Sequence, residues 1–490
     1  MRSSRVLPLV LAAALAAGAF APAPAAARER TGAAPLTQRL GGRVDQAGVR
    51  AGKLGVAVVD LESGALVFER GGDVALIPAS VAKVATAVAA LDALGPGYRF
   101  RTSIAGRGAV DPATGVLAGD LVLVGSGDPS LSKREHPTEP LWPFPQLAAA
   151  VRKLGIRSVT GALVLDDAPF DRVFVHPTWS ASDLDDWYGA PVAGLTFNDG
   201  CATVVVRGAA SPGRPAQVVF PSTAGPWPVD AQARTVEERT AQVGGAFTAD
   251  GRLRVFGSIG PGLEASFDAP VPDPLAFTGG AMLAALDAAG VKVAGGARPA
   301  ASAADRVGAT EIAAVENPIA PALRVMNRRS QNLYASLLFK AAGAARDGVG
   351  SWESGERAVA AALARRGLDG RGQRIVDGSG LSTANRLTAT SLARLLASAD
   401  AELLWGGLLR DSLAVPGEDG TLQKRFRDVR DRARLRAKTG TLGRTGVHAL
   451  AGYVDGRDGR RGYAFAVLVN DGKVDGRAVG DDVARILLDE

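Results

Sequence analysis

Ser80 and Lys83 are three residues apart, and together they could do nucleophilic chemistry. The apolar residues from Val84 to Leu91, followed by Gly95-Pro96, predict a helix that begins near Ser80. Side chains three residues apart share one face of a helix, so the lysine amine can lie beside the serine hydroxyl. A serine hydroxyl is a weak nucleophile until a neighbouring base activates it, and a helix N-terminus offers backbone N–H groups to a developing oxyanion.

The sequence contains a second pair with the same spacing, Ser130 and Lys133. That pair lies in the Gly- and Pro-rich segment 125–137, which is typical of a loop. The spacing alone is weak evidence, because Ser80 is also a good helix N-cap and Lys83 could be an ordinary surface lysine. We take Ser80 as the candidate nucleophile because two further motifs accompany it.

Two short motifs later in the chain carry groups that a serine acyl-transfer site needs. Ser330-Gln331-Asn332 lies between two segments with helical periodicity, 320–328 and 331–343. Lys438-Thr439-Gly440-Thr441 lies at the end of a predicted strand, and Lys-Thr-Gly occurs once in the chain. Taken singly, Ser330 and Asn332 are better explained as ordinary helix caps, and Lys438-Thr439-Gly440 is explained equally well as an exposed strand end.

Jointly, the order Ser-x-x-Lys, Ser-x-Asn, Lys-Thr-Gly resembles that of the active-site serine penicillin-recognising enzymes. The interval from Ser80 to Ser330 is 250 residues (330 − 80), far longer than in simple β-lactamases. A long insertion there is similar to the class C low-molecular-mass penicillin-binding proteins, the D-alanyl-D-alanine carboxypeptidase/endopeptidase family. Three further segments agree with that family: 119–129, 377–382 and 451–454.

The resemblance implies an acylation mechanism. Ser80 would attack the carbonyl of a D-Ala-D-Ala peptide or a β-lactam, and Lys83 would act as a neutral base, its pKa lowered by burial and by the Lys438 cation. No metal ion or organic cofactor is implied. The family pattern assigns the remaining roles as follows: Ser330 relays the proton to the leaving amine, Asn332 hydrogen-bonds the substrate amide, Lys438 and Thr439 hold the terminal carboxylate, Gly440 lets the substrate approach the strand, and the backbone N–H groups of Ser80 and Thr441 form the oxyanion hole.

Two positions depart from the family pattern. Gln331 stands where relatives often have Asp or Asn, and we expect its side chain to point away from the substrate. Thr383 stands where they often have Arg, which leaves the preference for a particular cross-link open. We interpret the remaining candidate residues as surface or packing residues: His136, His176, His448 and, as a buried small side chain, Cys201.

The fold expected is α/β (α+β), with a serine β-lactamase/DD-peptidase-like catalytic domain whose antiparallel five-stranded sheet is flanked by helices. Strands predicted at both ends of the chain suggest one sheet, so the catalytic domain would comprise residues 33–100 and 318–490. Residues 101–317 would form a large, mostly β insertion that supplies none of the covalent chemistry. We expect the insertion to have two lobes: 101–175 with 292–317, and 176–291.

One polar-aromatic stretch of the insertion contains Asp183, Asp185 and Tyr188. It has the composition of a surface turn, and we interpret it as one, although it could also face the cleft. Residues 1–27 have the charged start, the apolar Val6–Phe20 segment and the small-residue end of a signal peptide, too short to span a bilayer. Nothing else in the sequence resembles a transmembrane anchor.

Composition narrows the partners. The formal charge is +6, the basic residues are interspersed with acids, and aromatic residues make up 5%, which argues against nucleic-acid binding. The resemblance, together with the signal peptide, implies a secreted enzyme of the bacterial periplasm or cell envelope that acts on peptidoglycan peptides and binds β-lactams, with its oligomeric state open. Two alternatives remain: a β-lactamase or esterase on the same fold, and a non-catalytic cell-wall binding or β-lactam-sensing protein.

Overall fold

The computed structural model describes residues 34–221, 227–370 and 372–490. The predicted signal peptide, residues 1–27, lies outside the described residues. Within the described part of the chain, every helix is too short or too polar to cross a membrane.

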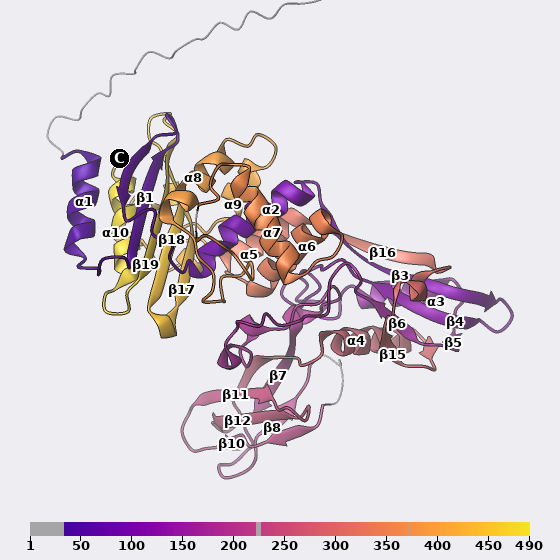
Figure 1. The fold of residues 1–490 in the computed structure, drawn as a ribbon. Coiled ribbons are helices and arrows are strands. Elements are labelled where there is room, and N and C mark those ends of the chain that lie inside the picture. The colour runs from indigo at the N-terminus through magenta and orange to yellow at the C-terminus, as the bar shows by residue number, and fades with distance from the viewer. Residues whose placement is uncertain (1–33, 222–226, 371) are drawn as a thin grey trace, which may run out of the picture.

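A five-stranded antiparallel sheet is built from both ends of the chain (Figure 1). β19 lies in its centre and is buried along almost its whole length, paired with β1 on one side and β18 on the other. This arrangement confirms the predicted fold class. In spatial order the strands are β17 (Leu435–Leu442), β18 (Val447–Asp455), β19 (Gly462–Asn470), β1 (Leu54–Asp60) and β2 (Leu66–Arg70).

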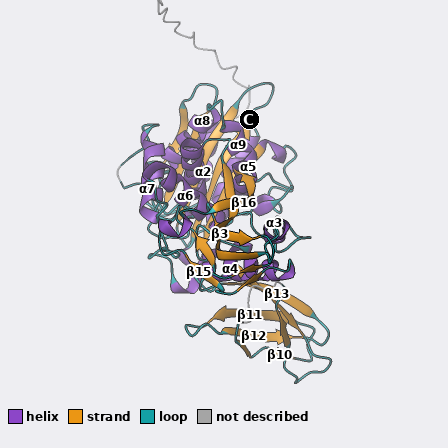
Figure 2. Ribbon diagram, turned by 90° about the vertical axis from the view of Figure 1, so that its right-hand side faces the viewer, coloured by secondary structure: helices purple, strands orange, loops and turns teal. Residues whose placement is uncertain are grey.

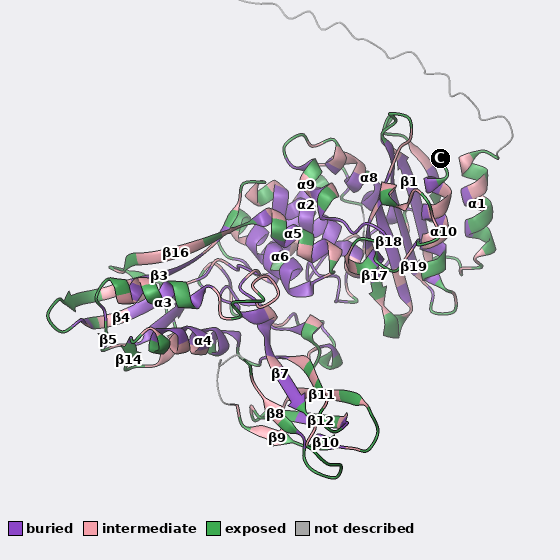
Figure 3. Ribbon diagram, turned by 180° about the vertical axis from the view of Figure 1, so that it is seen from behind, coloured by how far each residue is buried: buried purple, intermediate pink, exposed green. Residues whose placement is uncertain are grey.

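Helices cover both faces of this sheet, which explains why its central strands are apolar on both sides (Figure 3). On one face lie α1 (Leu36–Gln46) and α10 (Gly476–Leu488). The opposite face belongs to a hydrophobic cluster shared with six helices, of which α2 and α6 carry predicted site residues: α2 (Ala82–Leu94), α5 (Ile319–Arg328), α6 (Asn332–Asp347), α7 (Trp352–Ala364), α8 (Ala389–Asp400) and α9 (Gly406–Ser412).

The chain between α2 and α5 extends away from this sheet, and its described residues form three further sheets, of seven, four and three strands (Figures 1 and 2). The seven-stranded sheet packs against α3 (Phe144–Lys153) and α4 (Pro274–Ala288) in a shared hydrophobic cluster. Its seven strands are β3 (Arg99–Asp111), β4 (Val116–Val124), β5 (Ser158–Val159), β6 (Leu163–Asp166), β14 (Lys292–Val293), β15 (Ala297–Pro299) and β16 (Thr310–Pro318).

The farther part, here called the distal lobe, comprises residues 201–270 and has its own small apolar cluster. It begins and ends on one ladder, because Cys201 pairs with Pro270 at its base. Its strands are β7 (Cys201–Arg207), β8 (Gln217–Val219), β9 (Val229–Ala231), β10 (Arg234–Thr235), β11 (Ala241–Phe247), β12 (Leu253–Ile259) and β13 (Glu264–Pro270).

Several element predictions need correction. Helices α1 and α9 were not predicted. The strand expected to end at Lys438 continues to Leu442, so the Lys-Thr-Gly motif lies within β17 rather than at its end.

Candidate active site

Ser80 lies on a short 3-10 turn, Ala79–Val81, that runs directly into α2. Ala79 has a positive φ of 48°, so the backbone bends sharply just before the serine. The bend is held from the other side by Gly380, where a Cβ would lie 2.0 Å from the Ala79 carbonyl oxygen. Only glycine therefore fits at position 380, and the segment 377–382 packs directly on the turn that carries Ser80.

Lys83 is fully buried, and its amine lies beside the Ser80 hydroxyl. The Nζ atom is 3.0 Å from Ser80 Oγ, 2.7 Å from Asn332 Oδ1 and 2.5 Å from the Ser379 carbonyl oxygen. Burial lowers the pKa of Lys83 to about 7, although Asp377 opposes the shift. A neutral amine can donate to the amide and carbonyl oxygens and still present its lone pair to the Ser80 hydroxyl.

Asp377 organises the loop against which Lys83 lies. Its buried carboxylate accepts hydrogen bonds from the indole of Trp179 at 2.8 Å, the amide of Asn385 at 2.9 Å and the backbone N–H of Gly380 at 2.9 Å. Burial raises the pKa of this carboxyl, but the hydrogen bonds outweigh burial and leave the pKa below its ordinary value. The carboxylate thus fixes the position of the Ser379 carbonyl, one of the three acceptors around Lys83.

Ser330 and Lys438 form a second hydroxyl–amine pair, with 2.9 Å between Oγ and Nζ. Ser330 sits between α5 and α6 with a positive φ of 60°, as the spacing between the two predicted helices suggested. Lys438 is fully buried, and burial, reinforced by the Lys83 cation, lowers its pKa well below the ordinary value.

β17 is an edge strand, paired on one side with β18. Thr441 lines the cavity described below, whereas Thr439 and Gly440 do not appear in its lining. At Gly440 a Cβ would lie 2.8 Å from the Pro78 carbonyl oxygen, so glycine lets the strand pack against the turn that carries Ser80. Packing against this turn is therefore one reason for glycine at position 440. The predicted approach of the substrate to the strand is a second reason.

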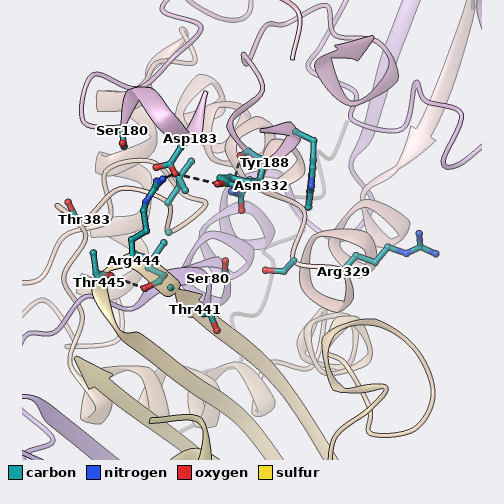
Figure 4. Close-up of a pocket in the computed structure, with 16 residues that line it drawn as sticks. Ser80, Ser180, Asp183, Tyr188, Arg329, Asn332, Thr383, Thr441, Arg444 and Thr445 are labelled. Atoms are coloured by element: carbon teal, nitrogen blue, oxygen red, sulfur yellow. Dashed lines mark hydrogen bonds and ion pairs between the residues drawn. The ribbon is translucent and has the colours of Figure 1, made fainter. Parts of the chain in front are cut away.

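A cavity of about 730 Å³ opens over Ser80 (Figure 4). Ser330, Asn332 and Thr441 line it together with Gly380 and Thr383. The three motifs, far apart in the sequence, therefore meet at one concave site. Arg329 and Leu381, beside these motifs, also line it. Two further segments complete the walls: one that was interpreted as a surface turn but could also have faced the cleft, and one after Lys-Thr-Gly-Thr that was not assigned to the site. They contribute Ser180, Asp183, Trp187 and Tyr188 of the insertion, and Leu442, Gly443, Arg444 and Thr445.

The surface-turn interpretation of the stretch 183–188 is therefore wrong for Asp183 and Tyr188. Asp183 is buried and forms an ion pair with Arg444 across the cavity. The Tyr188 hydroxyl donates to Asp186 at 2.8 Å, and burial together with that carboxylate raises the pKa of Tyr188 to about 12. Asp185 is absent from the cavity lining. The alternation of acidic and aromatic residues in this stretch indicated a possible role in the site. The local sequence did not show which part of the cavity the stretch would line.

The insertion also contacts the catalytic motifs directly. The Asn332 amide donates to the Tyr188 carbonyl oxygen at 2.9 Å, and Trp179 reaches Asp377 as described above. Gln331, expected to point away from the substrate, donates to Asp199 of the insertion at 3.2 Å. Asp199 in turn pairs with Arg134 at 2.7 Å. The insertion thus supplies supporting contacts for the Ser330-Gln331-Asn332 turn.

The other candidate residues lie outside this constellation. Ser130 donates to Asp128 at 2.6 Å, whereas Lys133 pairs with Asp268 at 2.7 Å. Cys201 is a buried free cysteine, as predicted. The histidines have packing contacts: His136 stacks on Trp142, His176 packs edge-on against Trp352, and His448 is half-buried. Within the described ranges, acidic, His and Cys side chains do not gather into a group that could hold a metal ion.

The fold and this constellation together define a penicillin-recognising serine enzyme. Residues 36–489 match the D-Ala-D-Ala carboxypeptidase 3 (S13) family, and the chain belongs to that family. The D-alanyl-D-alanine carboxypeptidase of Actinomadura sp. (strain R39) is 34% identical over 432 residues, covering 85% of this chain and 77% of that protein. Carboxypeptidase DacB of Mycolicibacterium smegmatis is 30% identical over 445 residues, covering 88% and 79%.

A solved structure shares the fold over the whole described chain. The crystal structure of penicillin binding protein 4 (dacB) from Haemophilus influenzae has a TM-score of 0.77 at 24% sequence identity, covering 91% of this chain and 98% of that chain. The family membership and this fold confirm the resemblance that was drawn from the motif order.

Proposed function

We propose that this protein is a serine-type D-Ala-D-Ala carboxypeptidase and DD-endopeptidase that hydrolyses peptidoglycan stem peptides and is acylated by penicillin. The observation that carries the proposal is the placement of a fully buried Lys83 amine, surrounded by neutral acceptors, 3.0 Å from Ser80 Oγ. A base of this kind needs a pKa near the working pH, and burial without an ion-pair partner provides it.

In the acylation step, Ser80 Oγ bonds to the carbonyl carbon and gives its proton to Lys83. The backbone N–H groups of Ser80 and Thr441 would stabilise the oxyanion, at a typical value of about 2.7–4 kcal/mol for each donor. The C–N bond then breaks, and the leaving amine takes a proton that Ser330 relays. Water next attacks the acyl carbon, Lys83 takes its proton, and the Ser80 oxygen leaves as a hydroxyl.

Lys438 would recognise the C-terminal carboxylate of the substrate. A terminal carboxylate beside Lys438 would supply the opposite charge that this buried amine lacks, and would restore its ammonium form. Thr439 would hydrogen-bond the same carboxylate, and Asn332 the substrate amide. Ala437 is bridged to Ala414 on the outer edge of β17, and the part of that edge beyond Ala437 would let an extended peptide add as a further strand.

We further propose that residues 33–100 and 318–490 form the catalytic unit and that 101–317 is an inserted region. Penicillin-binding relatives work in the cell envelope, and we place this enzyme there, in the periplasm of a bacterium, after cleavage of residues 1–27. Its partners would be peptidoglycan peptides and β-lactams.

The proposal is tested by intact-mass analysis after penicillin treatment, combined with D-Ala release from an uncross-linked pentapeptide. We expect one adduct, mapped to the peptide that contains Ser80 and lost in Ser80→Ala, and a slow return of free enzyme. An adduct on Ser130 would contradict the assignment of the nucleophile. Rapid penicillin turnover without D-Ala release would instead indicate a β-lactamase, and a stable adduct without D-Ala release would indicate a sensor.

A further inference from the structure

A second cavity of about 450 Å³ adjoins the active site. It is shallow, and three of its six lining residues are cationic. Arg329, which directly precedes Ser330, is common to the linings of both cavities, so it forms a shared wall between them. We call the second one the basic groove; it is lined by Lys133, Arg134, Pro137, Pro140, Asp268 and Arg329.

The basic groove keeps a net positive charge after its ion pairs are counted. Lys133 pairs with Asp268 at 2.7 Å, and Arg134 pairs with Asp199 at 2.7 Å. Among the residues that the structure describes, no carboxylate lies within ion-pair distance of Arg329, which is exposed. Its guanidinium can offer a planar pair of N–H donors to a carboxylate of a ligand.

The order of groups along β17 tells which part of the substrate faces this groove. If the terminal carboxylate of the leaving residue lies at Lys438 and the oxyanion at Thr441, the acyl part continues past Leu442 towards Arg444. The leaving group then lies at the opposite end, beside Ser330 and Arg329. Figure 4 shows Arg329 on the other side of Ser80 from Asp183 and Arg444.

We propose that the basic groove binds the second stem peptide of a cross-linked substrate, with a free carboxylate of that peptide paired with Arg329. This inference rests on the proposed function. In the carboxypeptidase reaction the leaving group is a single D-Ala, which ends at Lys438. In the endopeptidase reaction the leaving D-residue carries another stem peptide, which has to continue past Ser330, and the groove is the adjoining concave surface on that side.

The side chains of the groove suit such a ligand. Pro137 and Pro140 have restricted backbones and form part of its lining, so little conformational freedom is lost there on binding. The cations lie at its surface, where charge pairs are worth about 0.2–1 kcal/mol, so the groove would contribute selectivity for cross-links rather than high affinity.

The test uses two cross-linked muropeptide dimers that differ only in the leaving stem peptide, one with free carboxylates and one with those carboxylates amidated. We expect wild-type protein to cleave the acidic dimer with a KM about three- to fivefold lower, a preference that salt reduces. Arg329→Gln should abolish the preference and Arg329→Glu should reverse it. Arg324→Glu, an exposed position one turn earlier in α5, makes the same change in net charge and should keep the preference.

Each other outcome has a defined meaning. The inference is overturned if wild-type protein cleaves both dimers with the same KM. It is also overturned if the ratio of the two KM values is unchanged in Arg329→Glu. Equal inhibition of both dimers by poly(glycerol phosphate), lost in Arg329→Glu, would assign the groove to a phosphate polymer and also overturn it. Release of D-Ala from an uncross-linked pentapeptide by wild-type protein separates this failure from a failure of the proposed function, since that reaction leaves the groove empty.

Discussion

The two Ser-x-x-Lys pairs have the same spacing but very different surroundings. Lys83 is fully buried, and its three acceptors are a hydroxyl, an amide and a backbone carbonyl. The side chain of Lys133 is 36% exposed and is paired with the carboxylate of Asp268. Ser80 leads into a thirteen-residue helix, whereas Ser130 donates its hydroxyl hydrogen to Asp128. A lysine becomes a candidate base when it is buried without an anionic partner, and spacing alone does not provide that.

The largest loss of activity is expected when the buried amine of Lys83 is replaced. Lys83→Arg keeps the positive charge but cannot supply a neutral base, because a guanidinium does not lose its proton in proteins. Penicillin acylation should fall by about 10²–10⁴-fold, the usual contribution of a general base. The matched variant Lys438→Arg should retain more activity, since recognition of a carboxylate needs the charge. Acylation of Lys83→Arg at a rate near wild type would refute the base assignment.

The next effect comes from giving Lys83 the kind of partner that Lys133 has. Asn332→Asp places a carboxylate where Oδ1 now lies 2.7 Å from the amine, and should raise the pKa of Lys83 by about 1–3 units. Acylation requires the neutral amine, so its rate in wild type should rise as pH increases through about 7. In Asn332→Asp the midpoint should move to higher pH, and the rate at pH 7 should fall about 5- to 500-fold, in line with the size of the pKa rise.

High pH is the built-in control for this variant. If the change acts through the charge of Lys83, activity should return as the pH is raised towards 9. An unchanged midpoint with a uniformly reduced rate would show instead that loss of the Asn332 amide donor, which contacts the Tyr188 carbonyl and is assigned to the substrate amide, causes the defect rather than the added charge.

The sequence contained enough to find the elements that hold the motifs. The helix around Ser80 was predictable, because the segment is rich in apolar residues and has no Gly or Pro before Gly95, and α2 does end at Leu94. The strands of the five-stranded sheet were predictable because their apolar runs are bounded by turns. The turn at Ser330 followed from the gap between two helical patterns. These are local signals, and the structure places them as expected.

The contributions of the insertion were not predictable in the same way. Trp179, Tyr188 and Asp199 contact the site across more than a hundred residues of sequence, and no local pattern tells which group a loop residue will reach. The position of helix α4 was also not predictable from local sequence. It lies within 176–291 in the sequence, yet it packs with β4 and β6 of the seven-stranded sheet. We therefore propose the narrower boundaries 201–270 for the distal lobe.

A smaller effect should follow from removing a hydrogen bond to the loop that contacts Lys83. Trp179→Phe keeps the ring but removes the indole donor from Asp377, whose loop supplies the Ser379 carbonyl to Lys83. A hydrogen bond to a charged group is worth about 1.5–3 kcal/mol, so we expect a clear loss of thermal stability and a several-fold slower acylation. Trp227→Phe is the matched control, because Trp227 packs among the aromatic rings of Phe220, Phe247 and Phe277. Equal effects of the two substitutions on acylation would argue against a role for the Trp179 contact.

The smallest effect is expected when Lys133 is released from its carboxylate. Asp268→Asn removes the charge 2.7 Å from the Lys133 amine and leaves it, like Lys83, with neutral acceptors. Water still solvates this ammonium group, because the side chain is 36% exposed, and the Ser130 hydroxyl still donates to Asp128. Penicillin should therefore label Ser80 and not Ser130, at a rate within about twofold of wild type, since the site is a surface ion pair of small energetic value. Peptide mapping of the adduct measures both quantities. A label on Ser130 in this variant would show that the absence of a counter-ion is sufficient by itself, and burial would then no longer explain why Lys83 differs from Lys133.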